Sequence, residues 1–256
     1  MALDIEKTEK KSQNAQDGIS LTVDVVIFSL RPRHQHAWEA EDNQGRADDE
    51  LQVLLVRRAR APFQDYWALP GGRVRAEENL EEAAARQLRE KTALRASYLE
   101  QLYTFGRKDR DPRGRTISVA YYALVRTDRE KIEAGRDTAE ARWFPADELP
   151  PEMAFDHAEI LGYALWRLRN KIKYANIAFQ FLPPTFTLTQ LREVYDKIQG
   201  RNAKKEDPAN FKRKVEASGV IIETNERLEG GRHRPPRLYR AVVTPPNDPY
   251  QRGPIS

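Results

Sequence analysis

The feature that most constrains this chain is a glycine turn that runs directly into a long helical pattern. In the turn, Pro70-Gly71-Gly72, glycine permits backbone angles that a Cβ atom would forbid. Asn79 is a good helix cap, and the Glu82 carboxylate three residues later can accept a hydrogen bond from the Asn79 N–H. We therefore expect the stretch from Leu69 to Leu94 to form one rigid loop and helix.

The spacing within this unit resembles the Nudix box, G-x5-E-x7-R-E-U-x-E-E-x-G-U, in which U is aliphatic. The positions that match are Gly72, Glu78, Arg86, Leu88, Glu90 and Leu94. In Nudix hydrolases the three glutamates of the R-E-U-x-E-E segment hold divalent metal against a pyrophosphate. Here the corresponding positions are Gln87, Glu90 and Lys91, and Ala93 replaces the box glycine.

These substitutions remove the metal-binding half of the pattern. Positions 87, 90 and 91 share one helical face, and magnesium prefers anionic oxygen ligands. Gln87 offers a neutral amide, and Lys91 places a positive charge where the family has a carboxylate. Glu78 and Arg86, which in the family tie loop to helix, are both retained. We therefore expect no metal site, no required cofactor and no catalytic residue here.

Three interpretations of the box are open. The favoured one is a Nudix fold that binds its ligand without hydrolysing it, because the losses fall on the metal-ligand positions. The second is a working hydrolase that uses displaced carboxylates such as Glu77, Glu81 or Glu82. The third is a charged amphipathic helix with no site, which accounts for the helix but not for the loop spacing.

Composition sets the class of protein. The 256 residues are 39% hydrophobic and 32% charged, and a chain of this length can bury a substantial core. The sequence has no cysteine, which excludes disulfides, thiol nucleophiles and cysteine metal sites. The start, Met1 to Ser20, lacks the apolar core of a signal peptide, and no apolar run approaches a membrane span. We expect a soluble, cytoplasmic protein with no membrane partner.

Hydrophobic patterns predict a set of strands around the box. The segment between the first two, Arg31 to Glu50, is too polar for the core, and we expect its His34 and His36 to lie in a mobile hairpin loop without binding metal. The predicted strands are Leu21–Phe28, Gln52–Arg57, Trp67–Leu69, Ser97–Phe105, Thr116–Val125 and a last one at Arg142–Pro145.

A turn rich in cations, Gly106–Arg115, separates two of these strands. Beside a pyrophosphate-shaped cleft, its arginines could bind an anion, although a solvated charged loop is the alternative. Lys91 could also supply a cation where metal once neutralised the pyrophosphate. The candidate ligand-binding residues are Arg73, Glu90, Lys91, Arg107 and Arg113.

The C-terminal part is basic, with 18 Lys and Arg against 11 Asp and Glu from Asp156 to Ser256. This excess favours a polyanionic partner, although it could serve solubility alone. Asp156 caps a predicted connector helix whose apolar stripe runs from Ile160 to Ile172. His157, in its first turn, is expected to be structural.

The remainder has the pattern of a winged helix-turn-helix. Thr187 and Gln190 form a capping box for a helix at Leu188–Gln199, which Gly200 ends. Asp207 and Pro208 begin a second helix, Pro208–Ser218, with Phe211 and Val215 facing inward. A short cationic helix of this kind fits the DNA major groove. Its candidate DNA-binding residues are Asn210, Lys212, Arg213 and Lys214.

A predicted hairpin follows, with strands at Val220–Thr224 and Leu238–Val243. Its connection, Asn225 to Arg237, has the flexible and basic composition of a wing. Arg232, Arg234 and Arg237 could contact phosphates or a minor groove. The alternative is a small helical domain with a solvated hairpin that contacts protein.

Several segments in one order make the whole chain similar to the Nudix-related transcriptional regulators, the NrtR family. They are Leu21-Thr-Val-Asp24, the box ending Glu90-Lys-Thr-Ala93, Ala154-Phe-Asp-His157 and Phe211-Lys-Arg-Lys-Val-Glu216. The resemblance implies a dimeric bacterial repressor of NAD biosynthesis or salvage genes that binds palindromic double-stranded DNA and responds to ADP-ribose or a related nucleotide. Some relatives respond to sugars, so the effector is left open.

The expected fold class is α+β, a Nudix α/β/α sandwich followed by a winged helix domain. We expect a disordered tail at 1–19, the Nudix-like domain at 20–155, a connector helix at 156–178, the winged helix at 179–245 and a second tail at 246–256.

Overall fold

The computed structural model describes residues 18–32, 49–126, 132–135, 137–173, 176–200, 203–227 and 236–242. Nearly all of the expected N-terminal tail and the whole C-terminal tail lie outside these ranges, as do His34, His36, Arg232 and Arg234. Within them, no helix is both long and apolar enough to cross a membrane.

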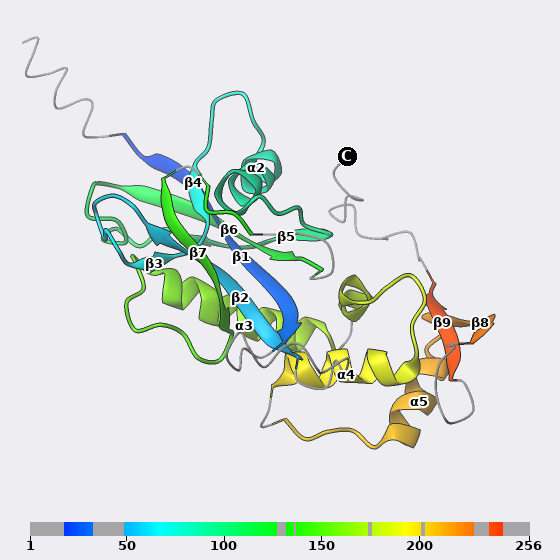
Figure 1. Cartoon of the computed structure of the whole chain (residues 1–256). Coiled ribbons are helices and arrows are strands. Elements are labelled where there is room, and N and C mark those ends of the chain that lie inside the picture. The colour runs from blue at the N-terminus through cyan, green and yellow to red at the C-terminus, as the bar shows by residue number, and fades with distance from the viewer. Residues whose placement is uncertain are drawn as a thin grey trace, which may run out of the picture.

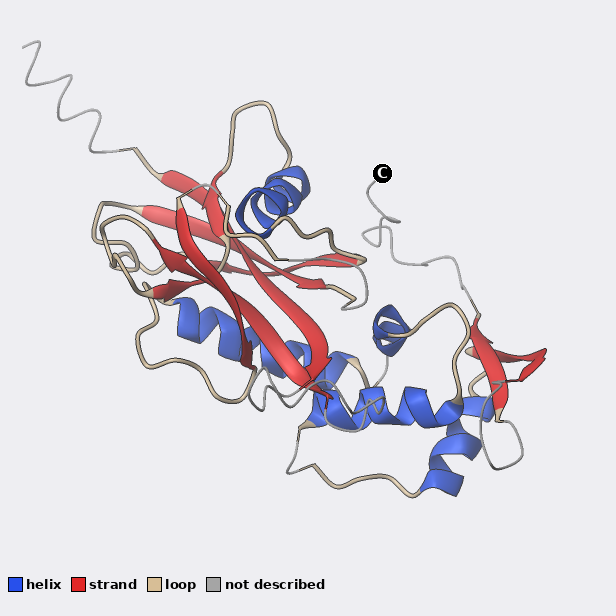
Figure 2. Ribbon diagram, in the orientation of Figure 1, coloured by secondary structure: helices blue, strands red, loops and turns tan. Residues whose placement is uncertain are grey.

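The N-terminal part is a sheet of seven strands with a helix on each face (Figures 1 and 2). The order is β3-β2-β1-β6-β5, with β4 paired to β1 and β7 to β2; only the pairing of β1 with β6 is parallel. The elements are β1 Ser20–Pro32, β2 Asp49–Arg58, β3 Trp67–Ala68, β4 Gly71–Arg73, α2 Leu80–Thr92, β5 Tyr98–Phe105, β6 Thr116–Leu124, β7 Thr138–Pro145 and α3 His157–Lys171.

Two hydrophobic clusters fill the layers of this sandwich. One lies between α2 and the sheet and includes Leu88, Val25 and Tyr121; the other lies on the α3 face and includes Phe28 and Leu165. Strand β1 is buried without interruption from residue 23 to residue 30 because it is central and covered on both faces. The predicted α/β/α sandwich is therefore confirmed.

The expectation that all of Arg31–Glu50 forms a polar loop is wrong at both ends. Arg31 and Pro32 belong to β1 and pair with Glu50 and Asp49 of β2. The Arg31 guanidinium lies over the Trp143 ring, 4.9 Å from its centroid. This contact with an aromatic surface allows a charged residue to belong to the strand.

The C-terminal part contains η2 Asn176–Phe181, α4 Leu188–Gln199, α5 Pro208–Ala217, β8 Ile221–Arg227 and β9 Arg237–Ala241. Phe186 exchanges two backbone hydrogen bonds with Tyr239, which adds a third extended segment beside the hairpin. The capping box of α4 is formed, and Gly200 ends that helix at φ 90°. Strand β8 extends three residues beyond the predicted Thr224, because Arg227 still pairs with Arg237 across the hairpin.

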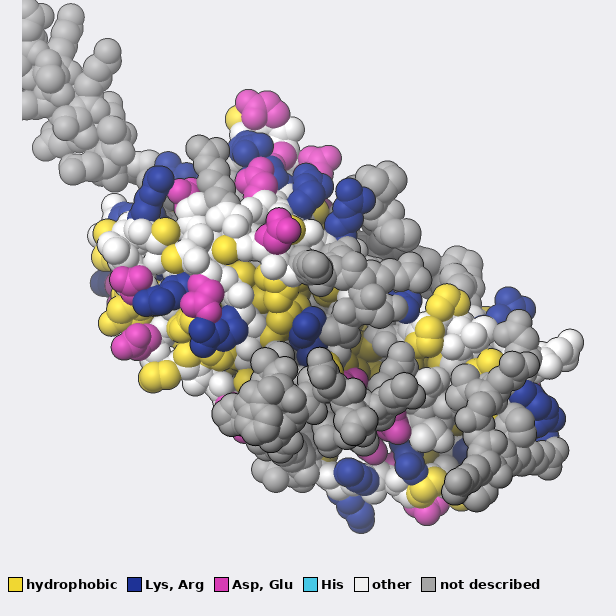
Figure 3. All heavy atoms as spheres, viewed as in Figure 1, with side chains coloured by type: hydrophobic (Ala, Val, Ile, Leu, Met, Phe, Trp, Pro, Cys, Tyr) yellow, Lys and Arg dark blue, Asp and Glu magenta, His cyan; other side chains and the backbone are white. Residues whose placement is uncertain are grey.

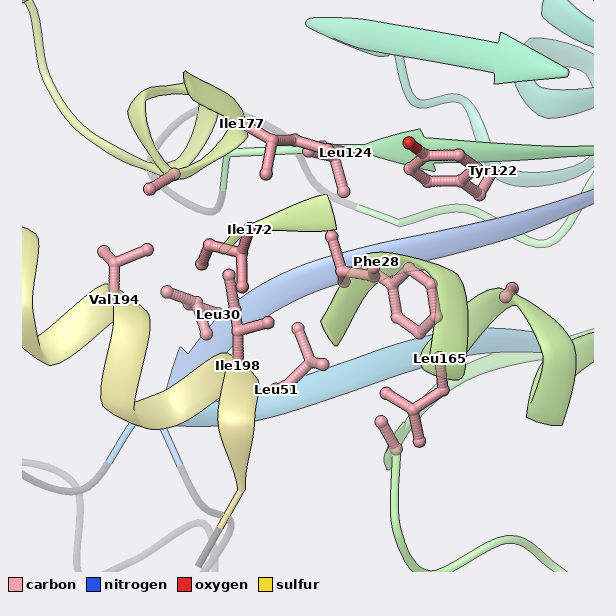
Figure 4. Packing of buried hydrophobic residues seen from close by; sticks show 14 of the residues in the cluster. Phe28, Leu30, Leu51, Tyr122, Leu124, Leu165, Ile172, Ile177, Val194 and Ile198 are labelled. Atoms are coloured by element: carbon pink, nitrogen blue, oxygen red, sulfur yellow. The ribbon is translucent and has the colours of Figure 1, made fainter. Parts of the chain in front are cut away.

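The two parts share one hydrophobic core, seen in Figure 4. Val194 and Ile198 of α4 lie in the same buried cluster as Leu30, Leu51 and Ile172 of the N-terminal part. Beside this cluster, Arg169 Nε donates to the Ile198 carbonyl at 2.9 Å, and Gln199 Nε2 donates to the Arg169 carbonyl at 2.8 Å. The helix that precedes α5 is therefore packed directly on α3 and the sheet.

Replacing Ala93→Gly should stabilise the protein by about 1 kcal/mol. Ala93 ends α2 at φ 61°, a left-handed conformation in which the Cβ atom is unfavourable. Urea unfolding monitored by circular dichroism would measure the change. Ala85→Gly, in the middle of α2, is the matched control and should destabilise by about 1 kcal/mol. A lower stability for the Ala93→Gly protein would contradict the argument.

Candidate functional site

The retained half of the box forms a compact network of charged side chains. Arg86 Nε donates to Glu78 Oε2 at 2.7 Å, and Arg86 Nη2 donates to the Arg73 carbonyl at 3.1 Å. Glu78 also accepts from the Arg75 N–H at 2.8 Å. The Arg86 guanidinium lowers the pKa of Glu78 to about 2. This network fixes the turn after β4 against helix α2.

The metal-ligand positions of the box have taken other partners. The retained carboxylate, Glu90, lies 3.2 Å from Arg86 Nη1 and 3.4 Å from Arg75 Nη2. With its amide oriented to suit both neighbours, Gln87 donates to the Gly71 carbonyl and accepts from Arg86, each at 3.0 Å. A Cβ atom on Gly72 would lie 2.4 Å from the Gln87 amide, so the turn and this amide are in close contact.

This helical face does not fit a divalent cation. Two arginines already neutralise Glu90, and the other two positions supply an amide that is buried and an ammonium group. Across the described ranges, no group of three or more histidines and carboxylates comes together as a metal site.

A cleft of about 450 Å³ lies among the glycine turn, the end of β2 and the loop before β6. Its size is in the range of small-molecule sites. Within the described part of the chain, its charged lining comprises six cations and two carboxylates: Arg58, Arg60, Arg73, Lys91, Arg113 and Arg115, with Asp111 and Asp137. The excess of cations makes the cleft suited to an anion that carries more than one charge.

Three of the five expected ligand residues line this cleft: Arg73, Lys91 and Arg113. The other two, Glu90 and Arg107, do not. The Arg107 guanidinium instead lies 3.5 Å from Glu159 of α3. Arg58 and Arg60 also line the cleft and were not predicted from the sequence, although three arginines within four residues at the end of a strand beside the box were a usable signal.

A buried cluster of charges next to the cleft was also not predicted from the sequence. Arg110 makes two hydrogen bonds to Asp156, at 2.9 and 2.7 Å, and a third to Asp24 at 3.3 Å. Ser118 Oγ donates to the same Asp24 carboxylate at 2.6 Å. The Arg110 side chain is only 4% exposed. Strand β1, the cleft loop and the start of α3 therefore meet at one guanidinium.

His157 has the structural role expected from the sequence. Its Nδ1 accepts a hydrogen bond from the Leu69 N–H at 2.9 Å, and its side chain is 6% exposed. Burial lowers the pKa of His157, although Asp24 opposes the shift. The neutral ring thus joins α3 to the segment just before the glycine turn.

The predicted recognition helix is α5, which has an exposed polar face. Asp207 Oδ1 accepts from the amides of residues 209 and 210 at 3.0 and 3.1 Å, and Phe211 is buried against Tyr195. The four candidate DNA-binding side chains on this helix are exposed, and Figure 3 shows Lys and Arg side chains over the same end of the molecule. They are Asn210, Lys212, Arg213 and Lys214.

These four polar side chains have partners on or near their own helix. Arg213 donates to Asn210 Oδ1 at 2.8 Å, Lys214 forms an ion pair with Glu206, and Lys212 lies 3.9 Å from Glu216. Such exposed pairs are weak and would exchange readily for phosphate oxygens.

Of the expected wing residues, the structure describes only Arg237. It lies on β9 and pairs with Glu223 at 2.7 Å. Its side chain is 52% exposed, so it remains open to a polyanion.

Replacing Glu78→Gln should destabilise the protein most at neutral pH. The pKa of about 2 in the folded chain lies below the value of about 4.3 expected after unfolding. The Arg86 pair therefore stabilises the fold above about pH 4.3, and this contribution disappears as the pH falls toward 2. Urea unfolding should show the difference in free energy shrinking between about pH 5 and pH 3. The exposed neighbour Glu77→Gln should show no such trend, and a constant difference for Glu78→Gln would refute the assignment.

Comparison with known proteins identifies both parts of the chain. The NUDIX domain model matches residues 40–163, and the NrtR DNA-binding winged helix domain model matches residues 178–241. The ADPR responsive transcriptional repressor NtrR of Acinetobacter baylyi is 37% identical over 228 residues, which cover 87% of this chain and 82% of that protein. The ADP-ribose pyrophosphatase of Methanocaldococcus jannaschii is 36% identical over 124 residues, which cover 48% of this chain and 72% of that enzyme.

The crystal structure of Shewanella oneidensis NrtR resembles the chain over both parts. Its TM-score is 0.68 at 34% identity, over 87% of this chain and 94% of that one. The structure of Shewanella oneidensis NrtR complexed with a 27mer DNA gives a TM-score of 0.66 at 31% identity, over 87% and 93%. The Acinetobacter baylyi repressor and the Shewanella oneidensis NrtR both match over most of their own length at more than 30% identity, and this chain therefore belongs to the Nudix-related transcriptional regulators, the NrtR family.

Proposed function

We propose that this protein is a transcriptional repressor of NAD metabolism genes, which releases its operator when ADP-ribose or a related nucleotide binds the Nudix cleft. The observation that carries the proposal is the cleft itself. Its cations lie beside the glycine turn of the box, while the metal-binding carboxylates of the family pattern are replaced at Gln87 and Lys91 and paired with arginines at Glu90. A cleft of this kind can bind a diphosphate without cutting it.

The charge of the cleft supports a nucleotide effector rather than a neutral sugar. A diphosphate carries negative charge that arginines can bind with paired hydrogen bonds, and Arg58, Arg73 and Arg113 all line the cleft. The Acinetobacter baylyi relative is named as responsive to ADPR. ADP-ribose is what remains of NAD after nicotinamide leaves, which fits a sensor of NAD turnover.

Hydrolysis is the second candidate function, because a relative over the Nudix part is an ADP-ribose pyrophosphatase. The local chemistry argues against it. Gln87 and Lys91 cannot supply the anionic ligands that a magnesium ion requires, and Glu90 is held by two arginines. We therefore infer that ligand binding requires no metal or cofactor and that the protein is not an enzyme. Release of AMP from ADP-ribose with magnesium, abolished in a Glu90→Gln variant, would overturn this inference.

Repression would require two copies of the chain. Helix α5 has ten residues and a length of about 15 Å, so a single copy can read only a short half-site. A homodimer would place two such helices on the halves of a palindromic operator. The exposed cations of α5 and β9 would supply the salt-dependent part of the affinity. Such a repressor would act on the bacterial chromosome, in the cytoplasm.

Replacing Arg213→Ala should weaken binding to operator DNA by about tenfold or more, because the helix loses a contact to base or phosphate. The probe is the duplex that the unaltered protein selects from a random-sequence library, and fluorescence anisotropy gives the affinity. Lys212→Ala should also reduce the slope of affinity against salt concentration by about 1. Lys108→Ala, an exposed lysine of the Nudix part, is the control and should change neither quantity. Equal affinities for all four proteins would exclude α5 as the reading helix.

Replacing Lys91→Glu should weaken metal-free binding of ADP-ribose by about tenfold or more, since a cation of the cleft becomes an anion. Titration calorimetry with EDTA present would measure the affinity. Lys91→Gln separates loss of the positive charge from gain of a negative one, and its effect should be intermediate. Unchanged affinity in both variants would remove Lys91 from the site.

A further inference from the structure

The junction between the cleft and α3 contains a backbone conformation that is unfavourable for its residue type. Phe155 has φ 54°, in the left-handed region, although it is not glycine. Its ring packs on Phe63, with centroids 4.8 Å apart, and Phe63 itself has φ 57°. Such conformations persist only where the surroundings hold them, and they are common at ligand clamps and switches.

Two arginines connect the packed rings of Phe63 and Phe155 with the cleft. The guanidinium carbon of Arg58 lies 4.9 Å from the centroid of the Phe155 ring, and that of Arg113 lies 5.6 Å away. Both arginines also line the cleft, and Arg113 is paired there with Asp111 at 2.7 Å. Besides its contacts with Phe63 and His157, the Phe155 ring is therefore held by two cations that a bound diphosphate would attract.

The next residue is fixed by a different cation of the same loop. Asp156, directly after Phe155, accepts both hydrogen bonds from the buried Arg110. Helix α3 begins at the residue after that. The start of α3 is thus attached to the cleft loop twice, through the Phe155 ring and through the Asp156 carboxylate.

The other end of α3 lies against the winged helix. The 15 residues of α3 span about 22 Å. Near the far end, Arg169 binds the carbonyl of Ile198 in α4 and, at 2.7 Å, the carboxylate of Asp147. Gly200 caps the end of α4, and a Cβ atom there would lie 2.7 Å from Arg169 Nη2. A shift of α3 would therefore displace the end of α4.

We propose, on the basis of the function proposed above, that Phe155 and Asp156 form the relay that couples occupancy of the cleft to the position of the DNA-binding helices. A bound diphosphate draws the Arg58 and Arg113 guanidinium groups toward its oxygens. Phe155 then loses two of the contacts that hold its left-handed conformation, while Arg110 keeps Asp156 attached to the moving loop. Helix α3 shifts as a rigid body and carries α4 with it.

The direction of the effect follows from competition between an aromatic ring and an anion. A guanidinium group over an aromatic face is held weakly at a partly exposed site, whereas a bidentate pair with phosphate oxygens is stronger. A bound diphosphate therefore has different contacts when the guanidinium groups lie on the Phe155 ring and when they lie on its own oxygens. Such a difference is the requirement for a ligand to shift an equilibrium.

The test measures the coupling separately from each binding event. For the unaltered protein, saturating ADP-ribose should lower the affinity for the selected duplex by roughly 10- to 100-fold. In Phe155→Leu, which keeps an apolar side chain but removes the ring, the same addition should lower it by less than about threefold. Binding of the duplex alone, and of ADP-ribose alone by calorimetry, should stay within about threefold of the unaltered protein.

Phe105→Leu is the matched control, since Phe105 is a partly buried aromatic residue on β5 that packs on Tyr163 away from the cleft. It should retain the full response.

Asp156→Asn, which removes the charge and keeps the size, is the second variant and should also lose the response. Thermal unfolding would confirm that this variant folds. Amide exchange in residues 157–161 should respond to ADP-ribose in the unaltered protein but not in Phe155→Leu.

The outcomes separate the relay from the function on which it rests. A full response in Phe155→Leu, with both ligands still bound, would overturn the relay and leave the proposed function intact. If ADP-ribose binds the unaltered protein but does not change its affinity for DNA, both proposals fall. Loss of the response in Phe105→Leu as well would also overturn the relay, because the effect would then be a general loss of packing.

Discussion

The buried guanidinium of Arg110 is the interaction on which the arrangement of this protein depends. A buried charge is tolerated only when it is paired, and removing one partner of such a pair is costly. Arg110 meets this requirement with Asp24 of β1 and Asp156 before α3. Because these partners come from the central strand and the connector, one side chain fixes the cleft loop relative to both. The same pairs help to set the position of α3 and of the elements packed on it.

The box shows how a binding site can keep its shape while its chemistry changes. Glu78 and Arg86 still tie the loop to the helix, as in the family pattern. The glycine turn that they hold lines the cleft. At the metal positions, Gln87 has become part of the packing and Lys91 lines the cleft. The result is a cleft whose excess of cations favours an anion.

One hydrophobic core connects the part of the chain that contains the cationic cleft with the winged helix part. Residues of α4 share a buried cluster with β1, β2 and α3, as Figure 4 shows. Interiors are close-packed, so a displaced helix moves its neighbours rather than compressing them. Two domains joined by a flexible linker would lack this property. Here Phe211 of α5, the expected recognition helix, belongs to the same buried cluster.

The sequence alone determined the strands, the helices, their caps and the box, and hence the family and the order of its domains. These features depend on residues only a few positions apart, such as the capping pairs Asn79 with Glu82 and Thr187 with Gln190. It also indicated three of the residues that line the cleft, Arg73, Lys91 and Arg113, because they lie in or beside the box and the cationic loop. Only the tertiary structure decided which cations face the cleft and which are buried. Arg110 lies 46 and 86 residues from its two partners, and no local pattern distinguishes a guanidinium group that will be enclosed from one that will remain in solvent.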